Sequence, residues 1–378
     1  MLSNCKDVLV IGGGTTGCGI AWSLARAGFK VRLLERNTIA SGASGASPGI
    51  VRQYYADSAL SVLAAEGLRV YREWSKIIGG DCGYHATGFL SAVPIADWAR
   101  VVKRVESLQA LGIEIEAISA DAILGLFPDG KLHGLAGAVH EPTAGYCDAV
   151  ATARALAQAA VRHGAIIEEH CTVRRFLSRQ GQVEGVETDT GVLQCPLIVN
   201  AAGPWAASLS ATCQATLPIS ASRQCVAIVE ILHDEGAAGL PGYSDRERGF
   251  YLRPVATNQY MIGSLMLEDS GPIDPDCLDR QMSEAAINQF TARAETRFSR
   301  FNSAMPRGSR VSFFDDTPDG NPIVGRDPRI EGLFVVAGLS GHGFKFAPVF
   351  GQAIVQAITS KTCMAGMESF AVERFLKK

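Results

Sequence analysis

The stretch that decides the fold is Val8-Leu9-Val10-Ile11-Gly12-Gly13-Gly14-Thr15-Thr16-Gly17, close to the amino terminus. Residues 8–11 are a continuous aliphatic run, which is typical of a strand buried on both faces of a parallel sheet. The glycines that follow fit the pattern GxGxxG, and apolar residues then recur at helical spacing as far as Gly28. The stretch therefore predicts a strand, a glycine-rich turn and a helix.

A second short apolar run, residues 31–34, ends at Glu35, which lies 18 residues after Gly17. In a dinucleotide-binding turn the first glycine permits the bend, the second lets backbone N–H groups approach the pyrophosphate, and the third allows close helix packing. An acid about 20 residues further on accepts hydrogen bonds from a ribose hydroxyl. The spacing predicts a dinucleotide site, with a purely structural βαβ unit as the alternative, and it does not distinguish FAD from NAD.

Residues 41–49 are nine small residues in succession, Ser-Gly-Ala-Ser-Gly-Ala-Ser-Pro-Gly. Such a segment is either a flexible surface loop or a place where a flat ring system lies against backbone. A linker here would split the nucleotide fold after its second strand, so we favour a loop that faces the cofactor. Arg52 follows at its far end.

Three separated apolar runs each lead into a glycine: residues 8–11 are followed by Gly12, and residues 197–203 and 332–338 end at Gly203 and Gly338. The carboxyl ends of parallel strands meet at one edge of a sheet, so we expect these three turns to converge on one ligand. The segment between them, from about 216 to 309, is typical of antiparallel strands followed by a helix over 281–297. The pattern predicts two interleaved domains, with residues 1–85, 146–215 and 310–378 in the nucleotide domain and residues 86–145 and 216–309 in a substrate domain.

The composition excludes several classes of protein. The 378 residues carry a net charge of −3, with 47% hydrophobic and 19% charged residues, which argues against nucleic-acid binding and against disorder. Ten scattered cysteines without a CxxC pair argue against a zinc site and favour reduced thiols in the cytoplasm. We expect no metal, no targeting segment and no membrane span, because no apolar run approaches 18 residues.

Further motifs carry a resemblance to a known family. They are Ala202-Gly203-Pro204-Trp205, the segment TPDGNPIVG at 317–325, and above all the segment GLSGHGFK at 338–345. With the glycine turn and Glu35, they resemble the FAD-dependent amine oxidoreductases of the D-amino-acid oxidase and sarcosine oxidase superfamily over nearly the whole chain. The similarity is closest to the branch of sarcosine oxidase, dimethylglycine dehydrogenase and the proline dehydrogenase β-subunit.

The resemblance implies a mixed fold, α/β plus α+β. A Rossmann-type FAD-binding domain would stand beside a smaller substrate domain built on an antiparallel sheet. It also implies FAD rather than NAD, and oxidation of a C–N bond by hydride transfer to the flavin.

The resemblance also implies roles for four catalytic residues. Arg52 and Lys345 would hold a substrate carboxylate near the flavin, where charge pairing in a dry site fixes orientation. His342 would lie beside the flavin, and Tyr251 would be an active-site aromatic on the antiparallel sheet. The structural alternatives are surface cations for Arg52 and Lys345, a satisfied polar group in a tight turn for His342, and sheet packing for Tyr251. The backbone amides of residues 341–344 would stabilise negative charge on the reduced flavin.

The expected FAD contacts are spread along the chain. They are Gly12, Gly14, Thr16, Gly17, Glu35, Arg36, Ser44, Gly45, Ala46, Ser47, Val173, Ala202, Gly203, Trp205, Gly338, Gly341, His342, Gly343, Phe344 and Lys345.

Three departures from the family pattern qualify these expectations. The cysteine that tethers FAD in monomeric sarcosine oxidases falls near Ser312 or Phe313, and residues 41–49 hold no histidine or cysteine, so we predict non-covalent FAD. The lysine that activates oxygen is replaced by Met261, which favours a quinone or a partner subunit as electron acceptor. The arginine that binds carboxylate in D-amino-acid and glycine oxidases falls near Phe314, which favours carboxylate binding by Arg52 and Lys345.

The expected substrate is a small amino acid with a secondary or N-substituted amine, such as sarcosine, proline or an opine, whose imine product is hydrolysed by water. Two alternatives use the same scaffold: an FAD-dependent D-amino-acid or 2-hydroxy-acid dehydrogenase, and a flavin-bearing subunit of a hetero-oligomeric dehydrogenase. An NAD-dependent dehydrogenase is a further alternative. The sequence does not name the amino acid, its stereochemistry, the electron acceptor or the oligomeric state.

Overall fold

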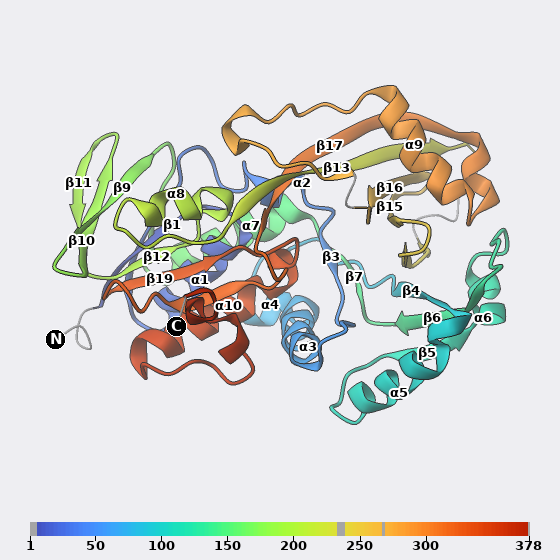
Figure 1. The fold of residues 1–378 in the computed structure, drawn as a ribbon, viewed down its shortest axis with the longest axis horizontal. Helices are drawn as coiled ribbons and strands as arrows, with labels where there is room; N and C mark the ends of the chain where they lie inside the picture. Colours follow the sequence, from blue (N-terminus) through green and yellow to red (C-terminus); the bar gives the residue numbers. More distant parts are fainter. Residues whose placement is uncertain (1–5, 233–238, 267–268, 377–378) are drawn as a thin grey trace.

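The computed structural model describes residues 6–232, 239–266 and 269–376, and two large sheets form its two halves (Figure 1). The first is a six-stranded sheet in the order β18-β19-β12-β1-β2-β8, parallel except for β18. Its strands are β1 (Asp7–Ile11), β2 (Lys30–Leu34), β8 (Ile166–Glu168), β12 (Ile198–Asn200), β18 (Ile323–Arg326) and β19 (Leu333–Ala337).

The three glycine-terminated runs are neighbours in this sheet. Strand β1 pairs with β12, and β12 pairs with β19, all in parallel. Apart from Asp7, the first residue of β1, every residue of these three strands is buried, because helices or other elements cover both faces. The turns that follow them therefore lie at one edge of the sheet.

Four helices pack around this sheet: α1 (Thr15–Arg26), α3 (Ser58–Arg72), α7 (Ala149–Arg162) and α10 (Gly343–Thr359). Helices α1 and α10 approach closely, since a Cβ atom at Gly19 would lie 2.7 Å from the carbonyl oxygen of Ala347. The close crossing places the amino-terminal ends of α1 and α10 in the same half of the molecule (Figure 1).

The second sheet has eight strands in the order β17-β13-β16-β15-β14-β4-β6-β5. They are β4 (Phe89–Pro94), β5 (Glu116–Ser119), β6 (Leu135–Glu141), β13 (Ser220–Ile231), β14 (Gly242–Asp245), β15 (Phe250–Ala256), β16 (Gln259–Ser264) and β17 (Ala304–Asp316). All pairs are antiparallel except β14 with β4. Helix α9 (Glu284–Glu295) packs on β13, β15, β16 and β17 through Ile287 and Phe290 (Figure 1).

Smaller elements complete the fold. A three-stranded sheet contains β9 (Val173–Arg179), β10 (Gln182–Thr188) and β11 (Gly191–Gln194), and a two-stranded one contains β3 (Ile50–Val51) and β7 (Gly145–Tyr146). The other helices are α2 (Ala43–Ala46), α4 (Trp74–Ile77), α5 (Trp98–Gln109), α6 (Ala120–Leu126) and α8 (Ala206–Ala211). Among the helices of the described ranges, none has the length and apolar character that a bilayer crossing requires.

The predicted fold class is confirmed: a nucleotide-binding α/β half stands beside a half built on an antiparallel sheet. The proposed domain boundaries stay a prediction, and β17 runs across the one placed at residue 310.

Helix α10 begins at Gly343, so Pro348 lies inside it. A proline inside a helix leaves the carbonyl four residues earlier without its N–H donor. Here the Tyr71 hydroxyl donates to that carbonyl, of Phe344, at 2.7 Å.

Candidate functional site

A cavity of about 950 Å³ runs between the two halves of the molecule. Its walls come from the start of α1, the small-residue segment, the glycine loop before α10, and one face of the eight-stranded sheet. This is the large end of the range for ligand sites in proteins.

The glycine turn after β1 has the geometry that a dinucleotide site requires. Gly12 has φ +108°, and a Cβ atom there would lie 2.5 Å from the carbonyl oxygen of Ala201. A Cβ atom at Gly17 would lie 1.9 Å from the Gly12 carbonyl oxygen, so α1 packs directly on the turn. Glu35 accepts hydrogen bonds from the backbone N–H of Gly13 at 2.6 Å and of Asn37 at 2.9 Å. The carboxylate expected to bind a ribose is thus held beside the turn expected to bind the pyrophosphate.

The small-residue segment closes over the amino terminus of α1. The Ser44 hydroxyl accepts a hydrogen bond from the Thr15 N–H at 2.9 Å, and Gly45 packs so tightly that a Cβ atom would lie 2.2 Å from the Ala40 carbonyl oxygen. Part of the segment is the short helix α2, where a loop was expected. The residues of the segment that line the cavity are Ala43, Ser44, Ala46, Ser47 and Pro48, together with Thr15 and Thr16 of α1.

Eleven of the twenty expected FAD contacts are absent from the cavity wall. Six of them lie in or beside the glycine turns and the small-residue segment: Gly12, Gly14, Gly17, Glu35, Gly45 and Gly338. The other five are Arg36, Trp205, Val173, Ala202 and Gly203. Arg36 and Trp205 form a cluster in which the Arg36 guanidinium lies 3.7 Å from the Trp205 ring centroid. Both donate to Asp276, at 2.8 and 3.0 Å. The other three are Val173 in β9 and, just beyond β12, Ala202 and Gly203. Ala202 and Gly203 follow β12, which lies between β1 and β19, so they stand at the same edge of the sheet as the glycine turn.

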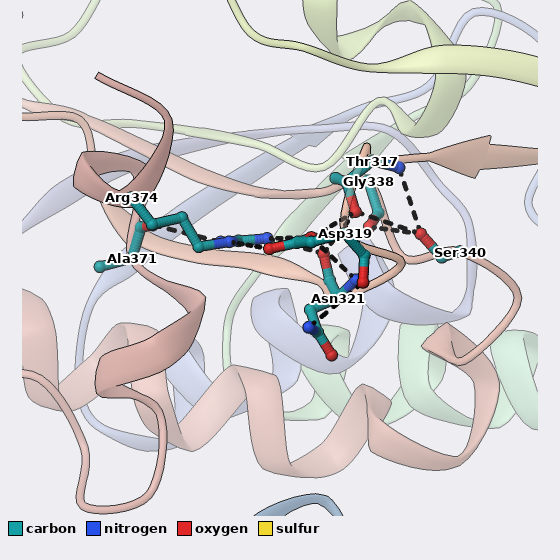
Figure 2. Close-up of polar contacts among 7 residues, drawn as sticks. All are labelled: Thr317, Asp319, Asn321, Gly338, Ser340, Ala371 and Arg374. Carbon is teal, nitrogen blue, oxygen red and sulfur yellow. Dashed lines mark hydrogen bonds and ion pairs between the residues drawn. The ribbon is translucent and has the colours of Figure 1, made fainter. Parts of the chain in front are cut away.

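Two of the motifs found in the sequence, at residues 317–325 and 338–345, meet just before α10. Figure 2 shows the Thr317 N–H donating to the Ser340 hydroxyl at 3.2 Å, and Asp319 accepting from Arg374 at 2.8 Å. The Arg374 guanidinium also donates to the Asn321 carbonyl at 2.8 Å. The network fixes residues 317–321 against residues 338–340, which positions the loop that leads into the cavity.

Glycine is required at two points of this loop. Gly338 has φ +64°, and a Cβ atom there would lie 2.4 Å from the Thr317 side chain; Gly341 has φ +79°, and its Cβ would lie 2.6 Å from the Phe314 ring. Helix α10 starts directly afterwards, and no side chain caps its amino terminus. The first amides of α10, at Gly343, Phe344 and Lys345, are therefore oriented to stabilise negative charge in the cavity.

Three of the four predicted catalytic residues meet around one aromatic ring, that of Tyr55. The Arg52 guanidinium carbon lies 4.7 Å from the ring centroid, and the Lys345 ammonium nitrogen lies 5.7 Å from it. The Tyr55 hydroxyl is 3.3 Å from Nδ1 of His342. Tyr55 was not predicted from the sequence, although the aromatic pair Tyr54-Tyr55, two residues after Arg52, was a usable signal.

A buried carboxylate supports this group from behind. Glu141 is 0% exposed and accepts hydrogen bonds from the backbone N–H groups of Gln53 and Tyr54. Burial raises the pKa of Glu141, while the positive charges of Arg52 and Lys345 act in the opposite direction. Two cations and one carboxylate leave a net positive charge, which one substrate carboxylate neutralises. Glu141 lies 89 residues from Arg52 in the chain, and it was not among the site residues predicted from the sequence.

His342 is neutral at physiological pH. Burial lowers the pKa of its imidazole to about 3, and the nearby charges of Lys345, Arg52 and Arg246 lower it further in the same direction. A neutral imidazole of this kind donates or accepts one hydrogen bond but is a weak base.

Tyr251 lines the cavity from β15, and its ring lies across Gly263 of β16. Burial raises the pKa of Tyr251 to about 12, so its hydroxyl stays protonated. Ser312, Phe313 and Phe314 line the same cavity from β17.

Met261 does not line the cavity: it is fully buried in β16, opposite Arg253 of β15. The position expected to hold an oxygen-activating lysine therefore lies on the same face of the sheet as Tyr251 but outside the cavity wall.

A protein-family model described as "FAD dependent oxidoreductase" (DAO) matches residues 7–357. This chain belongs to that family. The predicted relationship to the D-amino-acid oxidase and sarcosine oxidase superfamily, and with it the assignment of FAD, is confirmed.

Curated relatives and solved structures agree with this assignment. The chain is 30% identical to 4-methylaminobutanoate oxidase (formaldehyde-forming) of Paenarthrobacter nicotinovorans, over 97% of this chain and 45% of the relative. It is 26% identical to glycine oxidase of Geobacillus kaustophilus, over 98% of both chains. The crystal structure of L-proline dehydrogenase from P. horikoshii has a TM-score of 0.89 at 24% identity, over 98% of both chains, and shows the same fold. The chain spans less than half the length of several relatives, among them mouse sarcosine dehydrogenase at 42%.

The residues around the cavity fit the cofactor of this family. The Gly12 to Gly17 turn leaves no room for side chains where a pyrophosphate would approach, and Ser44 lies over the α1 amino terminus. The cavity continues from there to the α10 amino terminus, where the isoalloxazine end would lie.

Proposed function

We propose that this protein oxidises the C–N bond of an amino acid that carries a secondary or N-substituted amine, such as sarcosine, proline or an opine. The observation that carries the proposal is the convergence of Arg52 and Lys345 on the Tyr55 ring, in a cavity beside the uncapped end of α10. Two cations in contact with an aromatic face, with only one carboxylate behind them, form a site for one substrate carboxylate.

The described residues bind and orient the substrate rather than transfer its protons. Arg52 and Lys345 hold the carboxylate, so the α-carbon is presented towards the α10 end of the cavity. FAD, when bound, accepts the hydride from the carbon next to nitrogen. The amine must enter neutral, and the resulting imine is hydrolysed by water.

The chemistry of His342 disfavours the 2-hydroxy-acid alternative. Removing hydride from an alcohol carbon calls for a base close to neutral pKa near the hydroxyl group. His342 has a pKa lowered to about 3, and the Tyr251 hydroxyl stays protonated, so neither group serves as that base.

We further propose that FAD is bound non-covalently, that the protein acts in the cytoplasm, and that electrons leave to a quinone or a partner subunit. Non-covalent binding is supported by Ser312 and Phe313, which line the cavity where a tethering cysteine would stand. The choice of acceptor is supported by Met261, an uncharged and fully buried residue at the position where an oxygen-activating lysine was expected.

The test is an anaerobic assay of the FAD-loaded protein against an amino acid panel, read as loss of the flavin's visible absorbance. Steady-state turnover then compares oxygen with a quinone analogue. Arg52→Ala should raise KM about 10- to 100-fold, the loss of one charge-assisted hydrogen bond of about 1.5–3 kcal/mol. Arg248→Ala, at an exposed arginine outside the cavity wall, is the matched control. A panel that leaves the flavin oxidised throughout would reject the proposal.

A further inference from the structure

Cationic side chains outnumber carboxylates in the cavity wall. The six cations are Arg52, Arg100, Arg104, Arg246, Arg310 and Lys345, and the four carboxylates are Asp97, Asp245, Glu247 and Asp315. Two of the carboxylates are already neutralised, because Asp97 pairs with Arg100 at 2.7 Å and Asp245 pairs with Arg297 at 2.8 Å. The excess of positive charge is larger than one substrate carboxylate needs.

Four of the six cations form two groups; of the other two, Arg100 is paired with Asp97 and Arg310 lines the cavity from β17. The inner group is Arg52 and Lys345, with Glu141 behind them, and one carboxylate neutralises it. The outer group stands nearer the solvent and contains Arg104 on α5 and Arg246 on the turn between β14 and β15. Neither outer arginine forms an ion pair with a carboxylate of residues 6–232, 239–266 or 269–376.

Tyr54 places the two groups relative to each other. The Arg52 guanidinium donates to the backbone carbonyl of Tyr54. At the other end of the same residue, burial raises the pKa of the Tyr54 hydroxyl, and the adjacent Arg104 and Arg100 oppose that rise. Arg52 and Arg104 thus act on opposite ends of the same tyrosine, and both line the cavity. Arg246 lines the same cavity as the inner group, and its charge, like those of Lys345 and Arg52, lowers the pKa of His342.

We propose that the substrate is a dicarboxylate, a secondary amine with one carboxylate on each nitrogen substituent, and that Arg104 and Arg246 bind its second carboxylate. This inference rests on the proposed function, because it names the substrate class of the same site. The inner carboxylate is held by Arg52 and Lys345, the amine lies between the two groups, and the outer carboxylate reaches the cations at the mouth.

The reaction is balanced with FAD as the oxidant. The carbon next to nitrogen loses a hydride to the flavin, the amine loses its proton, and a C=N bond forms. Water adds to that bond and the C–N bond breaks, which gives a primary amino acid and a 2-oxo acid.

General electrostatic steering is the competing explanation of the outer cations. Steering raises the association rate of every anionic substrate, and salt screens it. A binding site acts on the second carboxylate alone. The two explanations therefore differ in the ratio between a dicarboxylate and a monocarboxylate substrate.

The experiment compares iminodiacetate with sarcosine, which differ by one carboxylate on an N-methyl group. In the FAD-loaded Arg104→Gln/Arg246→Gln protein, the ratio of kcat/KM for iminodiacetate to that for sarcosine should fall at least about tenfold, as expected for one lost charged hydrogen bond. Arg248→Gln, in the same turn as Arg246 but outside the cavity wall, should leave the ratio unchanged. A second readout is the change in the flavin spectrum on titration with glutarate and with butyrate, which needs no turnover. The double variant should lose the preference for glutarate.

The second carboxylate site would be overturned by an unchanged ratio of the two kcat/KM values. It would also be overturned if kcat/KM fell equally for both substrates and high salt had the same effect. Either result would leave the proposed function intact. If no amino acid reduces the flavin, the proposed function fails. In that case the glutarate and butyrate titrations still decide whether the outer cations bind a carboxylate.

Discussion

Asp315 is a buried carboxyl group in the cavity wall, at the end of β17. It is 8% exposed, and its Oδ2 atom has no hydrogen-bond partner among the residues that the structure describes. Burial raises the pKa of Asp315 to about 6, although the backbone N–H groups of Leu339 and Gly338 oppose the rise. The main-chain carbonyl of Asp315 also accepts from the Ser340 N–H at 2.9 Å, so backbone and side chain both contact the loop that leads into α10.

The pH dependence of this group has a definite sign. Between about pH 4 and pH 6 the folded protein holds the Asp315 proton and the unfolded chain has released it, so the free energy of unfolding falls as pH rises through that window. We expect Asp315→Asn to remove this loss. The Tm of the variant should exceed that of the wild type by an amount that grows from pH 4 to pH 7. The corresponding difference in the free energy of unfolding is up to about 3 kcal/mol. Thermal unfolding at a series of pH values measures it, with Glu106→Gln on exposed α5 as the control. Parallel curves for Asp315→Asn and wild type would contradict the assignment.

At the scale of elements, one arginine ties the two halves together at the small-residue segment. Arg253 of β15 is 6% exposed and donates to the carbonyl of Pro48 at 2.5 Å and to that of Pro254 at 2.6 Å. Its guanidinium lies 4.2 Å from the Tyr146 ring centroid in β7. Burial lowers the pKa of Arg253 to about 10, which leaves it charged at neutral pH. It forms no ion pair within the described part of the chain, so two carbonyls and an aromatic face are what hold this cation.

Arg253→Met should loosen the small-residue segment, because methionine fills space but donates nothing to the Pro48 carbonyl. We expect the Kd for FAD to rise about tenfold, the cost of one charged hydrogen bond. Fluorescence titration of the flavin-free protein with FAD measures this constant. Arg307→Met is the control, since Arg307 lies on β17 and pairs with Glu230 at the surface. An equal Kd in both variants would show that Arg253 has no part in holding the segment.

At the scale of the whole molecule, the cavity lies between the two halves, and both contribute residues to its wall. A bound FAD would touch the α1 turn, the small-residue segment and the α10 amino terminus at once. A ligand that binds only the folded chain stabilises it by RT ln(1 + [L]/Kd), about 2.7 kcal/mol at 100 times Kd.

We therefore expect FAD to raise the Tm of the flavin-free protein in a concentration-dependent way. Non-covalent binding also predicts that acid precipitation releases all the flavin into the supernatant. Intact-mass measurement of the pellet should give the bare chain. A mass larger by one FAD would contradict the prediction and would direct attention to another attachment residue.

The sequence by itself determined the local geometry of the nucleotide site and the family. Steric exclusion at Gly12 and Gly17 acts over a few residues, so strand, turn and helix follow from a short stretch of chain. Arg52, His342 and Lys345 were predicted because they belong to motifs, and the structure brings them together. That α10 continues through Pro348 does not follow from the sequence, because the carbonyl that Pro348 leaves free is satisfied by the Tyr71 hydroxyl, more than 270 residues away.

Only the tertiary structure decided how distant segments share the site. The Tyr55 hydroxyl meets His342 across 287 residues, Glu141 is buried behind Arg52, and Arg253 crosses from one sheet to the other half. Single residues of this kind carry no periodic or motif signal, since their partners are set by how the two sheets close around the cavity. Burial then sets their pKa values, and the charge around the cavity follows from which of the chain's cations end up in its wall.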